Sequence, residues 1–382
     1  MLAGRLSKLN RQELTDCKRI VVKVGTSTLT HNTDQLNLMR MESLTRELAD
    51  LHNQGRDVLL VSSGAIGVGV GRFGLKEAPR TLPMKQALAA VGQGTLLHMY
   101  EKLFAEYGKI VAQVLLTKDD FQERLRYLNC RNTLLTLLSL GVIPIINEND
   151  TVVVDEIKFG DNDTLSALVA GSVNADLLII LSDIDGLYDD DPRRNPEAKR
   201  RSEVYEITEE MEKSSHSRGT KLASGGMYTK LLAARMVMTA GIPMVVADGA
   251  DKDILRRIIA GEQVGTLFVP RENKMHARER WIAFSSFPQG SIQVDTGARD
   301  AIYKRGKSLL PGGVVGVDGD FERGEVVAII DPDGHEFARG ITNYSAGEIR
   351  LIAGQKTSQI EQILGGKDYD EVIHRNNLTL CD

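Results

Sequence analysis

Lysine and glycine stand close together at two widely separated places in this sequence. Lys23 precedes Gly25 at the end of a short β-branched segment, and Lys230 follows Gly225 and Gly226 before a helical segment. A glycine lets the backbone approach a ligand closely, a helix N-terminus carries partial positive charge, and a lysine adds a full one. Both places therefore favour phosphate binding, although the sequence contains no Walker A motif.

Carboxylate and amide side chains gather after one predicted strand and before one predicted helix. Residues 147–150 read Asn-Glu-Asn-Asp, and residues 160–163 read Gly-Asp-Asn-Asp in front of the predicted helix 164–173. A single Asp or Asn would be enough to cap that helix. The surplus suits a small polar ligand or a magnesium complex held at strand ends.

Two further strand ends carry small hydroxylated or acidic residues, Ser63-Gly64 and Ser182-Asp183. These suit an anion-binding turn and a turn near a nucleotide, but simple caps and turns use the same residues. Residues 69–74 formally match the G-x-G-x-x-G pattern of dinucleotide-binding enzymes. They do not directly follow a strand, and prolines interrupt the segment behind them, which argues against a dehydrogenase.

An alternation of strands and helices must position these groups. Helical periods include residues 38–51, where apolar residues recur every three or four positions before Gly55. Short, continuous β-branched segments indicate strands buried on both faces, at residues 20–24, 58–61, 110–116, 142–146, 177–181 and 244–247. The pattern predicts an α/β domain of three layers, with a mainly parallel sheet between helices.

The alternation of long helices and buried strands ends at about Pro270. Segments become short and rich in turns, and residues 326–330 and 337–341 read as a hairpin around the turn 331–334. We therefore expect a second, smaller, mostly β domain. The expected division is a first domain 17–270, a linker 271–285, a β domain 286–366 and a C-terminal tail 367–382.

Composition and charge exclude several classes of protein. The chain has 382 residues, a formal net charge of −5 and 5% aromatic residues, which argues against a strongly basic nucleic-acid-binding protein or a base-stacking platform. Segment 1–15 has no apolar core typical of a signal peptide, and 134–146 is too short to span a bilayer. The three cysteines fit no disulfide framework or zinc spacing, so we expect a cytoplasmic protein without a membrane partner.

Taken together, these motifs resemble the amino-acid kinase family, and within it the members that phosphorylate glutamate. The resemblance covers residues from about 17 to 382. It depends on the segments VVKVGTS (21–27), SSGAI (62–66), INEND (146–150), GDNDTLSA (160–167), DPR with NP (191–196) and GGMYTK (225–230). It implies a three-layer αβα sandwich joined, as in many bacterial members, to a C-terminal PUA domain. Members often carry Gly-Thr where this chain has Ala223-Ser224.

The resemblance also implies an activity, namely ATP-dependent phosphorylation of the side-chain carboxylate of L-glutamate. The product would be L-glutamyl 5-phosphate, in the first step of proline biosynthesis, with ATP and Mg²⁺ required. Lys23 and Lys230 would flank the transferred phosphoryl group, and Asp163 would organise them. The glutamate residues would be Ser63, Gly64, Asp150 and Asn162. The ATP residues would be Lys23, Gly25, Ser182, Asp183, Ser224, Gly225, Gly226, Met227, Tyr228, Thr229 and Lys230. No residue is assigned as a metal ligand.

Other readings stay open at this point. A kinase of the same family could act on aspartate, N-acetylglutamate or a nucleoside monophosphate. The chain could instead bind RNA through the PUA-like domain, but residues 276–382 carry 12 Lys/Arg and 16 Asp/Glu, a net charge of −4. Lys304, Arg305 and Lys307 alone cluster there, and we expect a solvated helix end. From the resemblance we expect a homodimer or homotetramer with proline as a feedback inhibitor.

Overall fold

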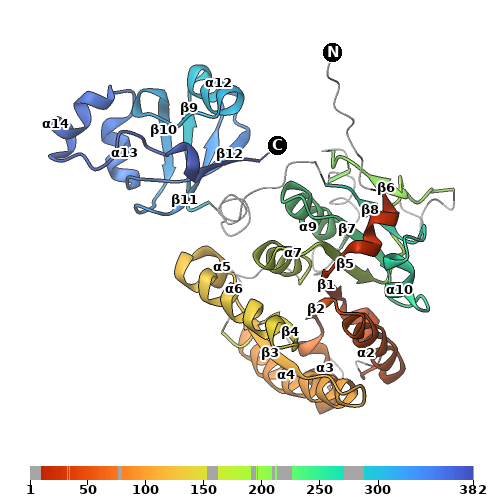
Figure 1. The fold of residues 1–382 in the computed structure, drawn as a ribbon. Helices are drawn as coiled ribbons and strands as arrows, with labels where there is room; N and C mark the ends of the chain where they lie inside the picture. The colour runs from red at the N-terminus through yellow and green to blue at the C-terminus, as the bar shows by residue number, and fades with distance from the viewer. Residues whose placement is uncertain are drawn as a thin grey trace. The chain divides into compact units, whose positions relative to one another are not determined.

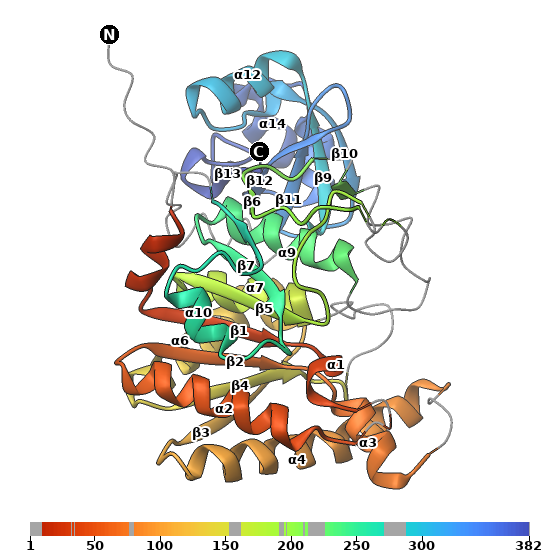
Figure 2. The ribbon, with the colours of Figure 1, turned by 90° about the vertical axis from the view of Figure 1, so that its right-hand side faces the viewer.

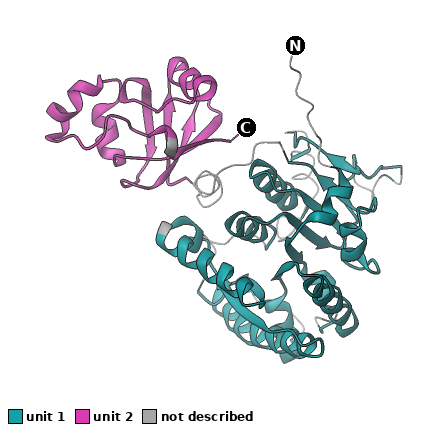
Figure 3. Ribbon diagram, viewed as in Figure 1, with its two compact units in different colours: residues 1–273 teal, residues 274–382 magenta. Residues whose placement is uncertain are grey.

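The computed structural model describes residues 10–31, 33, 35–75, 80–152, 162–190, 195, 197–208, 211–212, 226–270 and 288–381. The chain divides into two compact units, residues 1–273 and 274–382 (Figure 3). The predicted linker 271–285 lies outside the described residues, so the predicted domain boundaries stay predictions. Each unit has its own hydrophobic core.

The larger unit is built around an eight-stranded sheet of order β3-β4-β2-β1-β5-β7-β8-β6. Its strands are β1 (Arg19–Val24), β2 (Asp57–Ser62), β3 (Val111–Leu116), β4 (Ile143–Glu148), β5 (Leu177–Ser182), β6 (Glu203–Val204), β7 (Met244–Asp248) and β8 (Thr266–Phe268). Figure 2 shows β3, β4, β2, β1 and β5 side by side in that order. Within this sheet, as far as the structure describes it, only the β7–β8 pair is antiparallel. The predicted, mainly parallel sheet is confirmed.

Helices cover both faces of this sheet. They are η1 (Arg11–Asp16), α1 (Thr26–Leu29), α2 (Leu38–Asn53), α3 (Ala65–Phe73), α4 (Leu82–Ala105), α5 (Asp119–Gln122), α6 (Arg124–Ser139), α7 (Asn162–Val173), α9 (Met227–Thr239) and α10 (Ile254–Ile259). Figure 1 shows α7 and α9 on one side of the strands and α2 and α10 on the other. The three-layer αβα architecture is therefore confirmed, and the two helical layers can contribute side chains to a common edge of the sheet.

The two-residue period of β1 decides which layer each of its side chains meets. Val22 and Val24 belong to the core that β1 shares with α2, α4 and α10. Because successive side chains of a strand point to opposite faces, Lys23 points to the other layer, where α7 packs on β1. Helix α7 is buried along its whole length, as its apolar sequence requires. A buried lysine in a strand thus faces a buried helix.

Helices α3 and α4 approach each other unusually closely, and glycine makes this possible. A Cβ atom on Gly69 would lie 2.1 Å from the carbonyl oxygen of Leu88, and one on Gly92 would lie 1.8 Å from that of Ala65. Gly69 belongs to the segment 69–74, which forms the end of α3 and its C-cap rather than a turn after a strand. The G-x-G-x-x-G pattern therefore serves helix packing in this chain.

The smaller unit is mostly β, as predicted. Its strands are β9 (Gly290–Val294), β10 (Val314–Gly319), β11 (Val326–Ile330), β12 (Glu336–Ile341) and β13 (Leu378–Leu380), in the order β10-β9-β11-β12-β13. Its helices are α12 (Thr296–Arg305), η2 (Pro311–Gly313), α13 (Ala346–Ile352), η3 (Thr357–Gln359), α14 (Ile360–Leu364) and η4 (Arg375–Asn377). The predicted hairpin is the antiparallel pair β11–β12.

Two surface features of the chain bear on its partners. Lys304, Arg305 and Lys307 are exposed at the end of α12, and Lys304 pairs with Asp300 at 3.0 Å. This is the solvated helix end expected from the sequence. Among the described residues, no helix is both long and apolar enough to cross a membrane.

A buried arginine ties the segment before β1 to the far end of the sheet. The side chain of Arg11 is 4% exposed, and its guanidinium donates four hydrogen bonds of 2.6–3.1 Å to backbone carbonyl oxygens. The acceptors are Ser202, Glu262, Val264 and Gly265, which lie just before β6 and β8. Burial lowers the pKa of Arg11, which is the expected direction for a cation removed from water.

We expect Arg11→Ala to lower the free energy of unfolding of the larger unit by about 3 kcal/mol, because buried carbonyl groups lose a charged donor. A urea titration followed by circular dichroism measures this. The matched control is Arg46→Ala, whose half-exposed side chain pairs only with Glu42, at 3.7 Å, among the contacts described. That control should change the free energy by less than about 0.5 kcal/mol. Equal effects of the two variants would contradict the role assigned to Arg11.

Candidate active site

The carboxyl ends of the central strands meet at one edge of the sheet. In the parallel ladders, Val24 of β1 pairs with Ser62 of β2 on one side and with Leu181 of β5 on the other. On the next strand, Ser182 pairs with Asp248. Chain order reverses around β1, because β2 lies on one side of it and β5 on the other. In open α/β sheets, ligands bind at such a point.

Two buried lysines converge on one buried carboxylate at this edge. The Nζ atom of Lys23 lies 2.6 Å from Oδ1 of Asp163, and the Nζ atom of Lys230 lies 3.1 Å from Oδ2. The three side chains are 5%, 2% and 0% exposed, respectively for Lys23, Lys230 and Asp163. They come from β1, from the first turn of α9 and from the first turn of α7. The structure thus brings together the three residues predicted to be catalytic.

The charges of this cluster do not cancel. Two lysines and one aspartate sum to a charge of +1, in surroundings where water screens little. Burying a charged group costs desolvation energy even when the group is paired. The presence of a second buried lysine is therefore not explained by stability alone. An arrangement with an excess positive charge at a strand edge suits an anionic ligand.

Glycines keep the space around the cluster open. A Cβ atom on Gly25 would lie 3.9 Å from the Nζ atom of Lys23, so a side chain there would occupy the space next to the ammonium group. Gly64 is the N-cap of α3 and has a φ angle of +95°. Residues with a side chain adopt this left-handed conformation only with strain, whereas glycine adopts it easily. The backbone conformation at position 64 therefore favours glycine, whereas a small side chain at position 25 would only make van der Waals contact with Lys23.

Asn162 connects the start of α7 to the ends of β2 and β4. Its Nδ2 atom donates to the backbone oxygen of Ser62 at 2.8 Å, to Oδ1 of Asn147 at 2.8 Å and to Oγ of Ser63 at 3.0 Å. The structure thus brings two of the predicted substrate residues, Asn162 and Ser63, into direct contact. The side chain of Asn162 therefore reaches these strand ends rather than only capping the helix.

Adjacent residues of α7 therefore hold two networks together. Asn162 contacts the polar groups at the ends of β2 and β4, and Asp163 contacts the lysines of β1 and α9. Thr229 joins the second network, since its Oγ1 lies 3.0 Å from Oδ2 of Asp163. A polar site and a cationic site are fixed side by side by one helical turn.

Three more of the predicted residues, Asp150, Ser182 and Asp183, lie at the same strand ends. Asp150 is half-buried two residues after β4. Ser182 closes β5 and is 6% exposed, and its Oγ donates to Oδ1 of the exposed Asp183 at 3.1 Å. These positions agree with residues that contact ligands at the rim of the edge.

The glycine-rich segment before α9 is only partly described. Ser224 and Gly225 lie outside the described residues, whereas Gly226 is the N-cap of α9. Met227 and Tyr228 are half-buried in the first turn of that helix. The predicted nucleotide segment therefore leads directly into the helix that carries Lys230.

Sequence reasoning missed two residues that shape this edge. Gln93 of α4 accepts a hydrogen bond from Nδ2 of Asn147 at 2.6 Å. Gly249 follows β7, where a Cβ atom would lie 2.7 Å from Cγ2 of Thr28, so it lets α1 pack closely. A glycine directly after a strand is a usable signal, but no sequence pattern marks Gln93.

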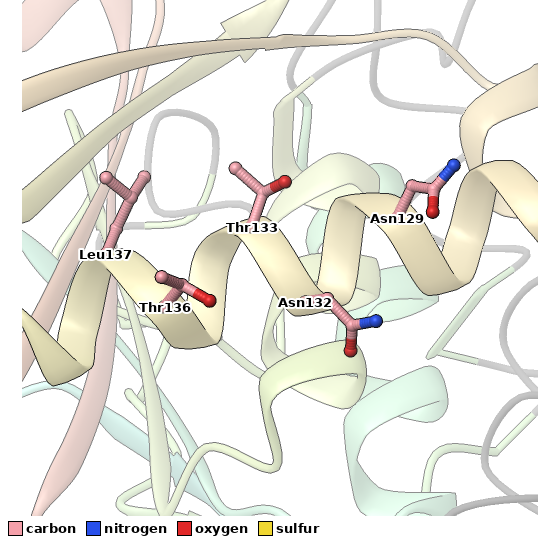
Figure 4. A pocket seen from close by; sticks show the side chains of 5 residues that line it. All are labelled: Asn129, Asn132, Thr133, Thr136 and Leu137. Carbon is pink, nitrogen blue, oxygen red and sulfur yellow. The ribbon is translucent and has the colours of Figure 1, made fainter.

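Metal ligands do not cluster in the parts of the chain that the structure describes, where no group of three or more His, Cys, Asp or Glu could hold an ion. A shallow hollow of about 420 Å³ does open along α6. It is lined by Asn129, Asn132, Thr133, Thr136 and Leu137 (Figure 4). None of the predicted site residues contributes to its lining.

The fold and the edge site define a class of protein, an αβα sandwich with two buried lysines around one aspartate at the edge of its sheet. The profile described as the amino acid kinase family matches residues 18–248, and that of the PUA domain matches residues 290–364. The chain belongs to the amino acid kinase family and, within it, to the group whose curated members carry the name glutamate 5-kinase. The predicted family is confirmed.

Three relatives illustrate the similarity. Glutamate 5-kinase of Moorella thermoacetica is 57% identical over 368 residues, covering 96% of this chain and 97% of the relative. That of Thermoanaerobacter pseudethanolicus is 56% identical, covering 95% and 98%. That of Geobacter sulfurreducens is 49% identical, covering 100% of both chains. Among solved structures, UMP kinase from Ureaplasma parvum is similar with a TM-score of 0.48 and 14% identity, covering 66% of this chain and 99% of that one.

Proposed function

We propose that this chain phosphorylates the side-chain carboxylate of L-glutamate with ATP, giving L-glutamyl 5-phosphate and ADP. The observation that carries the proposal is the turn of α7 that places Asn162 in a polar site and Asp163 between two buried lysines. A carboxylate acceptor and a triphosphate donor need two such sites in contact. The names of the relatives, glutamate 5-kinase, support the same reaction, which is the first step of proline biosynthesis.

The chemistry needs charge stabilisation rather than proton transfer. The acceptor carboxylate is already ionised near pH 7, so no general base is required. One carboxylate oxygen attacks the γ-phosphorus atom, the bond to the β,γ-bridging oxygen breaks, and ADP leaves with that electron pair. The reacting groups are both anions, and the transition state spreads negative charge over the phosphoryl oxygens. Lys23 and Lys230 would offset that charge, and Asp163 would hold both ammonium groups in position.

The substrates divide between the two networks. On this proposal glutamate contacts Ser63, Gly64, Asp150 and Asn162. The nucleotide contacts the residues predicted for it: Gly25, Ser182, Asp183 and residues 224–230. Mg²⁺ would enter as the complex with ATP, because this ion takes phosphate oxygens and water more readily than a full protein ligand set.

Several further expectations belong to this proposal. Residues 17–270 form the kinase domain and 286–366 the PUA domain, joined by 271–285; the boundary between the two units and the PUA profile support these two domains. The segment 367–382 was expected to be a tail, but it supplies β13 and the buried Val372 and Ile373 to the smaller unit. The enzyme assembles as a homodimer or homotetramer, and proline acts as a feedback inhibitor. The enzyme works in the cytoplasm. This is in keeping with the free thiol of Cys17, since burial raises the pKa of this thiol to about 12.

An ADP-release assay coupled to hydroxamate trapping of the acyl phosphate tests the function. With ATP, Mg²⁺ and L-glutamate, we expect ADP and hydroxamate in equal amounts, no turnover without Mg²⁺, and inhibition by added proline. Aspartate, N-acetylglutamate and UMP serve as matched acceptors and should give little product. Faster turnover of any of these three than of glutamate would overturn the proposal.

A further inference from the structure

Helix α4 supports the ends of two neighbouring strands through two hydrogen bonds. Oε1 of Gln93 accepts from Nδ2 of Asn147 in β4 at 2.6 Å, and the hydroxyl of Tyr100 lies 3.0 Å from Oγ of Ser62 in β2. Gln93 and Tyr100 are seven residues apart, so they lie on the same face of α4, two turns from each other. The alternation along β2 and β4 points Ser62 and Asn147 toward this face, since Leu60 and Ile145 belong to the core there.

The orientation of both asparagine amides can be assigned because each contacts a backbone group that can only donate or only accept a hydrogen bond. The backbone N–H of Glu148 can only donate, and it donates to Asn147 at 2.9 Å, so the atom there is Oδ1 and Nδ2 faces Gln93. The backbone carbonyl of Ser62 can only accept, so the atom of Asn162 beside it is Nδ2. The planar amide of Asn162 then turns its Oδ1 away from these acceptors.

We propose that Gln93 is a positioning residue for the acceptor substrate, acting through Asn147 on Asn162. The proposal rests on the proposed function, because it assigns a role in binding glutamate. Gln93 accepts the hydrogen of Asn147, which holds the Oδ1 atom of Asn147 toward Asn162. Asn162 in turn contacts Ser63, and its Oδ1 would accept a hydrogen bond from the ammonium group of an amino acid.

Loss of the acceptor at position 93 has a defined consequence. Asn147 is 2% exposed, so an unpaired N–H of its amide has little water to turn to. Rotation of that amide would not restore a partner, because its Nδ2 would then face two other donors, the Nδ2 atom of Asn162 and the backbone N–H of Glu148. The hydrogen bond from Asn162 to Asn147 would weaken as the amide of Asn147 shifts, and the acceptor site would loosen while the lysine cluster stays unchanged.

The test compares Gln93→Met, which keeps the length of the side chain without an acceptor, with Gln93→Glu, which keeps an acceptor oxygen. We expect Gln93→Met to raise the KM for glutamate about tenfold, the size of one buried hydrogen bond, with kcat and the KM for ATP within about twofold. Gln93→Glu should restore the KM for glutamate to within about threefold of the wild-type value.

Tyr100→Phe is the matched control, because it removes the other bond between the same helix and a strand end. Burial raises the pKa of Tyr100, so its hydroxyl is a neutral partner. This variant should lower the melting temperature and leave the KM for glutamate unchanged. The role of Gln93 is overturned if Gln93→Met has a wild-type KM, if Gln93→Glu is as impaired as Gln93→Met, or if Tyr100→Phe raises the KM equally. A wild-type enzyme without glutamate-dependent ADP release would instead overturn the proposed function.

Discussion

Lys230→Ala should lower kcat by on the order of 10²–10³ while the protein stays folded. The ammonium group of Lys230 lies 3.1 Å from Asp163 in a nearly water-free position, where its charge stabilises a developing anion strongly. Its removal leaves Lys23 and Asp163 as a neutral pair at 2.6 Å, so no buried charge loses its only partner. Activity should therefore fall without a matching loss of stability.

Steady-state kinetics, a urea titration and calorimetric binding of a non-hydrolysable ATP analogue together measure this. Binding of the analogue should weaken but persist, because the other nucleotide residues remain. Lys230→Met, which keeps most of the aliphatic stem, should behave like the alanine variant, and Lys102→Ala, on the exposed side of α4, should have the wild-type kcat. A near-normal kcat in Lys230→Ala would remove this lysine from the mechanism.

The sequence predicts the long elements of the fold well because their hydrophobic patterns are continuous. The strand 326–330 has the predicted bounds. Five of the six buried strands predicted for the larger unit agree with the observed strands to within one residue at both ends. Strands β6 (Glu203–Val204) and β8 (Thr266–Phe268) were not predicted. Segments of two or three residues show no period, and only the neighbouring strands make them part of the sheet.

The candidate site divides in the same way. Lys23 and Lys230 can be recognised in the sequence because each stands close to glycines, and Asp163 because it belongs to a group of polar residues in front of a helix. Only the fold shows that both lysines lie within 3.1 Å of the carboxylate of Asp163. The contact between Gln93 and Asn147 could not be predicted. It depends on the rotation of α4 about its axis, which the close packing at Gly92 determines and no local pattern encodes.

Asp163→Asn should cost both activity and stability, in contrast to the lysine variants. The two lysines would be left facing each other around a neutral amide, one of whose polar atoms is a donor. Removing one member of a buried charge network typically costs about 3–5 kcal/mol. We expect a loss of about 3 kcal/mol in the free energy of unfolding, together with a fall in kcat of at least about 10² because neither ammonium is held in position.

A double variant separates the two effects. Lys23→Met with Asp163→Asn leaves the single positive charge of Lys230 in the cluster, so it should recover part of the lost stability relative to Asp163→Asn alone. It should recover none of the activity, because a charge that meets the phosphoryl group is missing. Urea titrations and steady-state kinetics of Asp163→Asn and the double variant measure this, with the exposed Asp16→Asn as control. The prediction is that Asp163 stabilises the fold by offsetting the repulsion between Lys23 and Lys230. A double variant that is less stable than Asp163→Asn would contradict this.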